Sequence, residues 1–420
     1  MKRLGIFWLI HLIYLSLFFL NAEDQPLKLS TLINEAVSRN PKIKTAEHES
    51  LAYSHRIKPA HTLPDPMIEL GIQNMGLNRW MIGKDPNSGI AFSFSQLFPL
   101  FGKLKLSGEM AQKAYEGRLQ ALEAAKRDII RDIKTTYADL FYVYQSIETL
   151  EKQKNLMQKT LSITETRYTV GSGTQNDIFK AQSEISRMDE MIIPMREMIK
   201  MKEKTLNLLR DFPTDRPLGK PESLEIETIP VSLEQLEGDL RRQSPRIKEA
   251  QAMEDEQSLM VRYSRKELIP DINVRAGYEY KGKMTGMVEL MLGAQIPLYA
   301  GRRQTQRLLE AQAAATSAAW ETRSMQNEML MALNDHFLKA KTAENMIRLY
   351  KTRILPQARL STESSFAAYP TNKADFMSLI NDISTQFSAE RAYFRELTEL
   401  WKALATIESL TTVPLLSPKE

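Results

Sequence analysis

A heptad pattern of apolar residues constrains this chain most, because it requires long helices that pack side by side. The first half carries one row at every seventh position, at Ile178, Ile185, Ile192, Ile199 and Leu206. Companion residues stand at Ala181, Met188, Met195 and Leu209. The second half has the rows Phe376, Ile383, Leu397, Leu404 and Ile380, Phe387, Phe394, Trp401. We predict that these rows are buried helix seams.

The segments before these rows also predict helices. The stretches from about Leu104 to Tyr168 and from about Arg303 to Phe366 are each roughly 60 residues long, or about 90 Å as helix. Helices of this length cannot fold back into a small globule. Pro194 and Pro356 lie inside the helical pattern and are expected to bend it locally.

The same order of signals occurs twice, offset by about 200 residues. The matching segments are Asn40-Pro41 with Ser244-Pro245, Leu63-Pro64-Asp65 with Ile269-Pro270-Asp271, Phe98-Pro99-Leu100-Phe101-Gly102 with Ile296-Pro297-Leu298-Tyr299-Ala300-Gly301, and Asp177-Ile178 with Asp375-Phe376. We therefore predict two structural repeats at 23–210 and 233–410, each running helix, two strands, long helix, tight turn and long helix. A linker with four prolines at 211–232 joins them, and 411–420 is a C-terminal tail.

The first residues predict export from the cytoplasm. Lys2 and Arg3 precede an apolar stretch from Ile6 to Leu20, and a small residue, Ala22, follows. These are the features of a secretory signal peptide, expected at 1–22. An uncleaved anchor is the alternative, but the apolar run is shorter than the ~20 residues of a helical membrane span. The chain has no cysteine, which excludes disulfides and a lipid-modified N-terminal cysteine.

Four short segments alternate between apolar and polar residues, which predicts strands with one face of each kind. They are Met67–Gln73, Ile90–Ser95, Ile272–Tyr280 and Val288–Ile296. The polar faces hold Glu69, Gln73, Asn273, Arg275, Glu279, Glu289 and Gln295. A half-buried sheet on a soluble core would alternate in the same way, but the export signal favours a membrane barrel with these residues in its lumen.

Four strands cannot close a barrel, since about eight is the practical minimum. Open strand edges cannot be left in lipid either, because their backbone groups would lack hydrogen-bond partners. Several copies of the chain must therefore share one barrel. Two copies would supply about eight strands and three copies about twelve.

The motifs resemble those of the TolC family of outer membrane efflux proteins, from about Leu27 to Leu410. They are Leu29-Ser30-Thr31-Leu32-Ile33-Asn34-Glu35-Ala36 with Asn40-Pro41, Leu63-Pro64-Asp65-Pro66, Ser95-Gln96-Leu97-Phe98-Pro99-Leu100-Phe101-Gly102-Lys103, and Arg167-Tyr168-Thr169-Val170-Gly171-Ser172-Gly173-Thr174. The resemblance implies an α+β, mostly helical fold and a homotrimer. It implies a 12-stranded transmembrane β-barrel, four strands per chain, and a long periplasmic α-helical coiled-coil barrel.

The resemblance also implies a function and partners. A family member is a passive conduit of a tripartite efflux system, and it works with a periplasmic adaptor (membrane fusion) protein and an inner-membrane pump, here favoured to be of the RND type. The Leu-Pro-Asp-Pro and Phe-Gly-Lys elements favour the heavy-metal branch of CzcC and CusC, whose members often carry the lipid-modified cysteine that this chain lacks.

The resemblance places an aperture gate at Asp177 and Asp375, where three copies of each carboxylate would attract cations. The best-known gate of the family has a second Asp three residues after the one in the second half, where this chain has Ser378, so a full double ring is not expected here. The alternative is that each Asp only caps or solvates the first turn of its helix. The hairpin tips that would dock the adaptor are Val170, Gly171, Ser172, Gly173, Thr174 and Tyr369, Pro370, Thr371, Asn372. Plain turn geometry would also explain their glycines.

No enzyme, cofactor or metal site is expected. The 56 Lys and Arg nearly balance 52 Asp and Glu, which gives no reason to expect nucleic acid. The methionines on heptad positions are interpreted as packing, and His48, His55 and His61 are not expected to bind metal. Two alternatives to an efflux channel remain, namely a periplasmic coiled-coil structural protein and an outer-membrane conduit for type I protein secretion.

Overall fold

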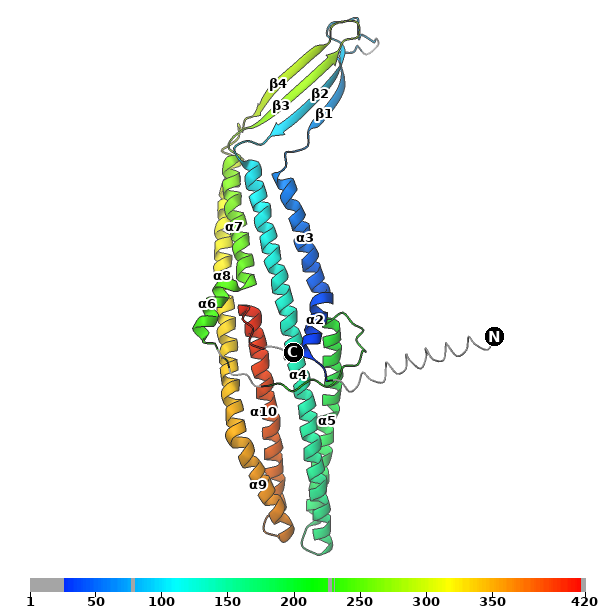
Figure 1. The fold of residues 1–420 in the computed structure, drawn as a ribbon, viewed down its shortest axis with the longest axis vertical. Helices are drawn as coiled ribbons and strands as arrows, with labels where there is room; N and C mark the ends of the chain where they lie inside the picture. Colours follow the sequence, from blue (N-terminus) through cyan, green and yellow to red (C-terminus); the bar gives the residue numbers. More distant parts are fainter. Residues whose placement is uncertain (1–25, 77–79, 226–228, 230, 417–420) are drawn as a thin grey trace, which may run out of the picture. The chain divides into compact units, whose positions relative to one another are not determined.

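The computed structural model describes residues 26–416 apart from 77–79, 226–228 and 230 (Figure 1). The predicted signal peptide therefore lies outside the described residues, as do parts of the predicted linker and tail. The elements are α2 (Leu29–Arg39), α3 (Pro41–His61), β1 (Met67–Gln73), β2 (Gly89–Phe98), α4 (Lys103–Thr169), α5 (Gln175–Leu209), α6 (Leu233–Gln243), α7 (Pro245–Lys266), β3 (Asp271–Tyr280), β4 (Met287–Gln295), α8 (Gln304–Leu349), the π-helix η1 (Tyr350–Ile354), α9 (Leu355–Ala368), the 3-10 turn η2 (Tyr369–Thr371) and α10 (Phe376–Thr411).

The predicted mostly helical fold with one small antiparallel sheet is confirmed. One detail differs, because each half begins with two helices instead of one. The break falls at Asn40-Pro41 and again at Ser244-Pro245, where the residue before proline is extended at ψ 125° and ψ 120°. Proline disfavours helical backbone in the residue before it, so the same dipeptide ends the first helix in both halves.

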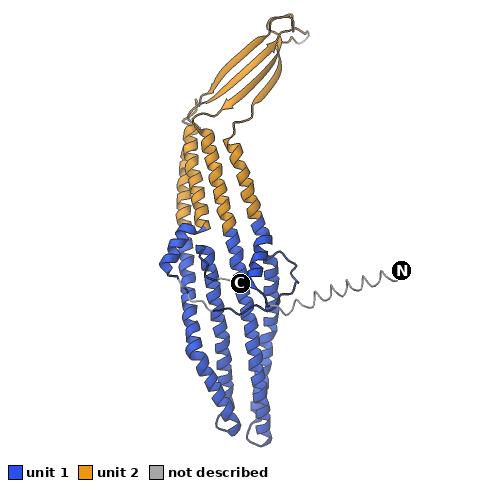
Figure 2. Cartoon of the chain, in the orientation of Figure 1, with its two compact units in different colours: residues 1–44, 124–244, 328–420 blue, residues 45–123, 245–327 orange. Residues whose placement is uncertain are grey.

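The chain divides into two compact units, and each draws on both halves of the sequence (Figure 2). Unit 1 contains residues 1–44, 124–244 and 328–420, and unit 2 contains residues 45–123 and 245–327. The compact units are thus a different division from the predicted repeats, which follow the order of signals along the chain.

In unit 1, the α4–α5 hairpin packs against α9 and α10 through the predicted heptad rows. A buried cluster joins them: Met157, Ala181, Met188, Tyr369, Phe376, Leu379, Ile380, Ile383 and Phe387. None of the heptad residues named above is exposed. The two prolines behave differently, since α5 runs through Pro194, whereas the π-helical turn η1 directly precedes α9 and its Pro356. Proline and π-turns are both known causes of local irregularity in a helix, and here the two stand next to each other.

In unit 2, the four strands form one antiparallel sheet in the order β1-β2-β3-β4. The central pair, β2 and β3, joins the two halves of the sequence, with Phe98 opposite Ile272 and Ile90 opposite Tyr280. Each edge strand has a single partner among the described strands: β1 pairs with β2, and β4 with β3. All residues of β1 and β4 are exposed. Within the described part of the chain, no helix is both long and apolar enough to cross a membrane.

Candidate functional site

The charged side chains in the sheet of unit 2 lie on one face, and most of the large apolar side chains lie on the other. Residues opposite one another on neighbouring strands share a face, and Glu69 lies opposite Ser93, Ser93 opposite Gly277, and Gly277 opposite Glu289. Because side chains alternate along a strand, the same face holds all seven predicted lumen residues, which are Glu69, Gln73, Asn273, Arg275, Glu279, Glu289 and Gln295. The seven residues therefore share one face of the sheet, and their position in a lumen remains a prediction.

An ionic network crosses this polar face. The Arg275 Nη2 lies 2.5 Å from Glu69 Oε2 and 2.9 Å from Ser93 Oγ, and Ser93 Oγ donates to Glu69 at 3.1 Å. The network therefore spans three strands, β1, β2 and β3. In contrast, Glu289 has no ion-pair partner among the described residues. The face thus has a paired carboxylate, Glu69, on one edge strand and an unpaired carboxylate, Glu289, on the opposite edge strand.

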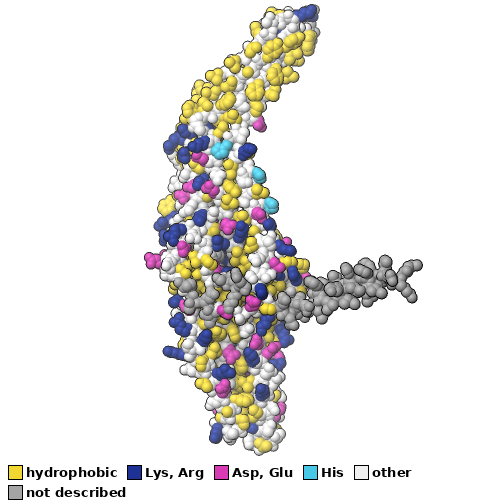
Figure 3. Space-filling model, in the orientation of Figure 1, with side chains coloured by type: hydrophobic (Ala, Val, Ile, Leu, Met, Phe, Trp, Pro, Cys, Tyr) yellow, Lys and Arg dark blue, Asp and Glu magenta, His cyan; other side chains and the backbone are white. Residues whose placement is uncertain are grey.

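The opposite face is apolar and open to solvent in the single chain. Leu70 is 76% exposed, Val288 83% and Leu290 78%. Aromatic rings continue the same face, at Phe92, Phe94, Tyr278 and Tyr280. Figure 3 shows hydrophobic side chains gathered over the strands. Contiguous apolar surface of this kind is rare on monomers in water and marks contact with lipid or another chain.

The first hairpin tip, Val170–Thr174, joins α4 to α5. Gly171 has φ +74°, a left-handed conformation that glycine adopts without strain. Thr174 and Asp177 form a capping box, in which the Thr174 hydroxyl accepts from Asp177 N at 3.3 Å and donates to Asp177 Oδ2 at 2.8 Å. Thr174 therefore defines the start of α5, and Asp177 lies within the first turn.

The second tip, Tyr369–Asn372, reaches its left-handed turn without glycine. Asn372 has φ +60°, which asparagine tolerates better than most residues. Asp375 then caps α10 and accepts from Ser378 N at 2.9 Å and Ser378 Oγ at 2.7 Å. These hydrogen bonds hold the pKa of Asp375 below its usual value.

The two candidate gate residues thus occupy different helical positions. Asp375 is the N-cap of α10, whereas Asp177 is the third residue of α5. Each accepts hydrogen bonds within its own helix start, as the capping alternative expects. A carboxylate that caps a helix still carries its negative charge. A gate role for Asp177 and Asp375 in an assembly therefore remains a prediction.

Arg167, at the end of α4, connects the two tips and was missed as a site residue. Its guanidinium donates to the carbonyl of Tyr369, to Ser172 O at 3.1 Å and to Asn372 Oδ1 at 2.6 Å. It also lies 4.3 Å from the centroid of the Tyr369 ring. The sequence placed Arg167 beside the tip, but its partners on the other hairpin lie more than 200 positions away.

Tyr369 differs from the other predicted tip residues because it is only 2% exposed. Its hydroxyl lies 2.9 Å from Thr164 Oγ1, and its ring packs 6.1 Å from the Phe376 ring, between centroids. Val170, Ser172, Pro370 and Thr371 are exposed at the same end of the hairpins. The latter four, and not the Tyr369 ring, are available to a partner in the single chain.

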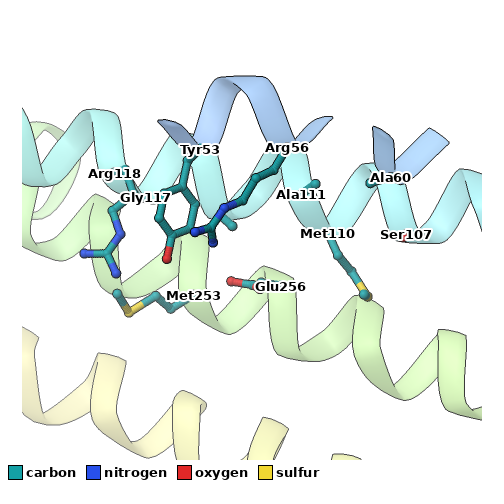
Figure 4. A pocket seen from close by; sticks show the side chains of 11 residues that line it. Tyr53, Arg56, Ala60, Ser107, Met110, Ala111, Gly117, Arg118, Met253 and Glu256 are labelled. Atoms are coloured by element: carbon teal, nitrogen blue, oxygen red, sulfur yellow. The ribbon is translucent and has the colours of Figure 1, made fainter. Parts of the chain in front are cut away.

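A cavity of about 330 Å³ lies in unit 2 between α3, α4 and α7 (Figure 4). Arg56 and Arg118 flank the ring of Tyr53 at 4.1 Å and 5.0 Å from its centroid. The hydrogen bond and charge of Arg118 lower the pKa of Tyr53, and burial raises the pKa of Glu256. The two arginines in the cavity already have the Tyr53 ring and carboxylates as neighbours. The polar lining of the cavity therefore does not require a ligand.

Comparison with known proteins identifies the fold. The sequence profile described as "Outer membrane efflux protein" matches residues 32–209. The structure resembles the outer membrane protein VceC of Vibrio cholerae, with a TM-score of 0.78 and 18% identity, over 91% of this chain and 96% of VceC. It also resembles CusC, with a TM-score of 0.78 and 14% identity, over 93% of this chain and 94% of CusC.

A curated relative matches a shorter stretch. Nodulation protein T of Rhizobium leguminosarum bv. viciae is 25% identical over 95 residues, which span 23% of this chain and only 20% of that protein. The TolC-like fold that the sequence resemblance implies is confirmed by the solved structures, and these comparisons do not test the heavy-metal branch. Residues 32–209 thus match the outer membrane efflux protein family, and the chain has the TolC-like fold of these channels.

Proposed function

We propose that this chain is the outer membrane channel subunit of a tripartite efflux system and acts as a passive conduit for small solutes. One observation carries the proposal, namely the sheet with a polar face, an exposed apolar face and two open edges. Exposed apolar surface costs about 25 cal/mol per Å² in water, and lipid removes that cost. The polar face would then line an aqueous pore.

The open edges support assembly with further copies. Backbone groups at the edges of β1 and β4 have no strand partner among the described residues, and lipid cannot supply one. We propose a homotrimer, in which four strands per chain make a twelve-stranded barrel. The match to the outer membrane efflux protein family supports this number.

We further propose a location and partners. The barrel would lie in the cell outer membrane and the helices of unit 1 in the periplasm, after export through the signal peptide at 1–22. A periplasmic adaptor would contact the exposed tip residues, and an inner-membrane pump of the RND type would deliver the solute. Asp177 and Asp375 would ring the aperture with carboxylates and favour cations.

Heavy-metal cations are the proposed cargo class. The proposal rests on the Leu-Pro-Asp-Pro and Phe-Gly-Lys elements, because the likeness to CusC at 14% identity concerns the fold alone. Metal and drug tolerance of a deletion strain would test it. A loss of metal tolerance supports the proposal, and a loss of neither tolerance would favour protein secretion or another cargo.

The channel itself is tested by fractionation and conductance. We expect a heat-modifiable trimer in the outer-membrane fraction that forms steady, cation-preferring pores in planar bilayers. Recovery of the folded chain as a soluble periplasmic monomer would contradict the channel and favour the structural coiled-coil alternative.

A further inference from the structure

An ion pair joins the two halves of the chain at the base of the sheet. Lys103, the first residue of α4, is 5% exposed, and its Nζ lies 2.7 Å from Asp271 Oδ1 at the start of β3. The same ammonium donates to Ile269 O at 2.8 Å, and Leu100 N donates to Asp271 Oδ1 at 3.2 Å. The pair therefore fastens the end of β2 to the beginning of β3.

The repeat places a carboxylate and a cation at the matching positions of the two edge strands, with Arg302 in place of a lysine. Asp65 follows Pro64 just before β1, as Asp271 follows Pro270 at β3. Arg302 follows Gly301 after β4, as Lys103 follows Gly102 after β2. Both Asp65 and Arg302 are exposed, and neither has an ion-pair or side-chain hydrogen-bond partner among the described residues.

The sheet geometry prevents this second pair from forming inside one chain. The edge strands β1 and β4 are separated by β2 and β3, so their backbones lie about 14 Å apart at about 4.8 Å per strand spacing. Lys103 and Asp271 meet because β2 and β3 are direct neighbours. Arg302 and Asp65 would meet only where β4 of one copy is the neighbour of β1 in another.

The register of such a contact follows from the central pair. Phe98 lies opposite Ile272, so the equivalent position puts Ile296 opposite Pro66 of the next copy, and Gln295 opposite Met67. Gln295 and Met67 both belong to the polar face, as do their counterparts Leu97 and Asn273 by alternation. In this register the polar face of one copy continues into the polar face of the next copy, and the apolar faces continue in the same way.

We propose that Arg302 of one copy forms an ion pair with Asp65 of the next copy, and that this pair fastens β4 to β1 as Lys103 and Asp271 fasten β2 to β3. The partner is a second copy of this chain. This inference rests on the proposed shared barrel, and it adds the residues and the register of the joint between copies.

Crosslinking tests the contact directly, because the chain has no native cysteine. The double variant Asp65→Cys/Arg302→Cys is treated in membranes with a short bis-maleimide reagent and run on denaturing gels. We expect covalent dimers and trimers. Lys103→Cys/Asp271→Cys is the matched control, with a crosslink inside one chain and no increase in mass, and each single variant is expected to stay monomeric.

Charge reversal supplies a second measurement that does not depend on the reagent. Asp65→Arg and Arg302→Asp are each expected to lower the temperature at which the native oligomer dissociates in detergent. The combined variant is expected to restore it, because the pair is re-formed with the charges exchanged. If each substitution only disturbed the local structure, the double variant would instead show the sum of the two decreases in dissociation temperature.

The outcomes separate this inference from the proposed function. Oligomeric, conducting channels in which Asp65→Cys/Arg302→Cys yields only single-chain bands, and in which the charge exchange gives no rescue, would overturn the ion pair and leave the channel standing. A wild-type chain that forms no oligomer and no pore would overturn both.

Discussion

Arg167 lies over the ring of Tyr369, with its guanidinium carbon 4.3 Å from the ring centroid, and thereby ties the end of α4 to the tip of the α9–α10 hairpin. The same group donates to Ser172 O and Asn372 Oδ1, so one side chain holds both tips. The tips that we propose to dock an adaptor are therefore positioned by a residue behind them.

Arg167→Ala is expected to lower the free energy of local unfolding of the two tips by roughly 1.5–3 kcal/mol. This is the usual contribution of hydrogen bonds to a charged group. Hydrogen exchange should become faster in the two tips and leave the rest of α4 unchanged. Arg167→Lys is the informative control, because it keeps the charge and loses the planar fork. Equal exchange in all three proteins would show that packing around Tyr369 alone holds the tips.

Glu408 fastens the segment after α10 to the body of unit 1. Its Oε1 accepts from Leu415 N and Leu416 N, each at 2.6 Å, and Oε2 pairs with buried Lys134. Glu408→Ala should destabilise the fold by about 3–5 kcal/mol, because it leaves an ammonium buried without its partner. Glu399→Ala, on the same helix with a side chain 52% exposed, should change stability by less than about 0.5 kcal/mol. Urea unfolding measures the stability of both variants. Similar unfolding midpoints for the two would contradict the stabilising role of Glu408.

Tyr137 predicts a loss of stability at alkaline pH. Its hydroxyl donates to Leu27 O and accepts from Glu222 N, each at 2.8 Å, and burial raises its pKa from 10.0 to about 12. Above pH 10.0 the unfolded chain releases this proton while the folded chain retains it. The contribution of Tyr137 to the free energy of unfolding therefore falls between pH 10.0 and about 12. The melting temperature of Tyr137→Phe should fall less steeply than that of wild type across this range. Parallel curves would contradict the shifted pKa.

Asp375 allows the cap to be separated from the proposed gate. Asp375→Asn keeps the N-cap, because asparagine caps as well as aspartate, but removes the charge. It should therefore leave the melting temperature unchanged while raising resting conductance and reducing cation preference in single-channel recordings. Asp375→Ala should in addition lower the melting temperature, because alanine cannot cap the helix. Wild-type conductance and selectivity in Asp375→Asn would reduce Asp375 to a helix cap.

Leu290 and Glu289 are neighbours on opposite faces of β4, and they test which face meets lipid. Leu290→Lys should reduce the yield of heat-resistant oligomer, because a lysine facing the bilayer midplane costs about 2–4 kcal/mol. Glu289→Lys should assemble normally and shift ion selectivity toward anions. In the single chain Leu290 is 78% exposed, so a soluble fold would tolerate both substitutions equally. Equal yields would therefore argue against the membrane-facing assignment.

Much of the fold could be predicted because the relevant signals are local periodicities. Seven-residue spacing determined that Ile192 and Ile383 are buried, and two-residue alternation determined that Glu69 and Glu289 share a face while Leu70 and Leu290 share the other. These patterns depend only on backbone geometry within one segment. The order of signals predicts one helix across Asn40-Pro41, although proline disfavours helical backbone in the residue before it and the structure has a break there.

Only the tertiary structure decided which distant side chains meet. Lys103 and Asp271 are 168 positions apart, and Arg167 and Asn372 are 205 apart. No periodicity within a segment predicts such pairs, because each depends on how two separately formed elements pack. For the same reason Tyr369, predicted as a surface residue of a turn, is buried. The sequence by itself determined the helices, the strands and their faces, while the packing of one half against the other decided the contacts that hold the tips and the sheet base.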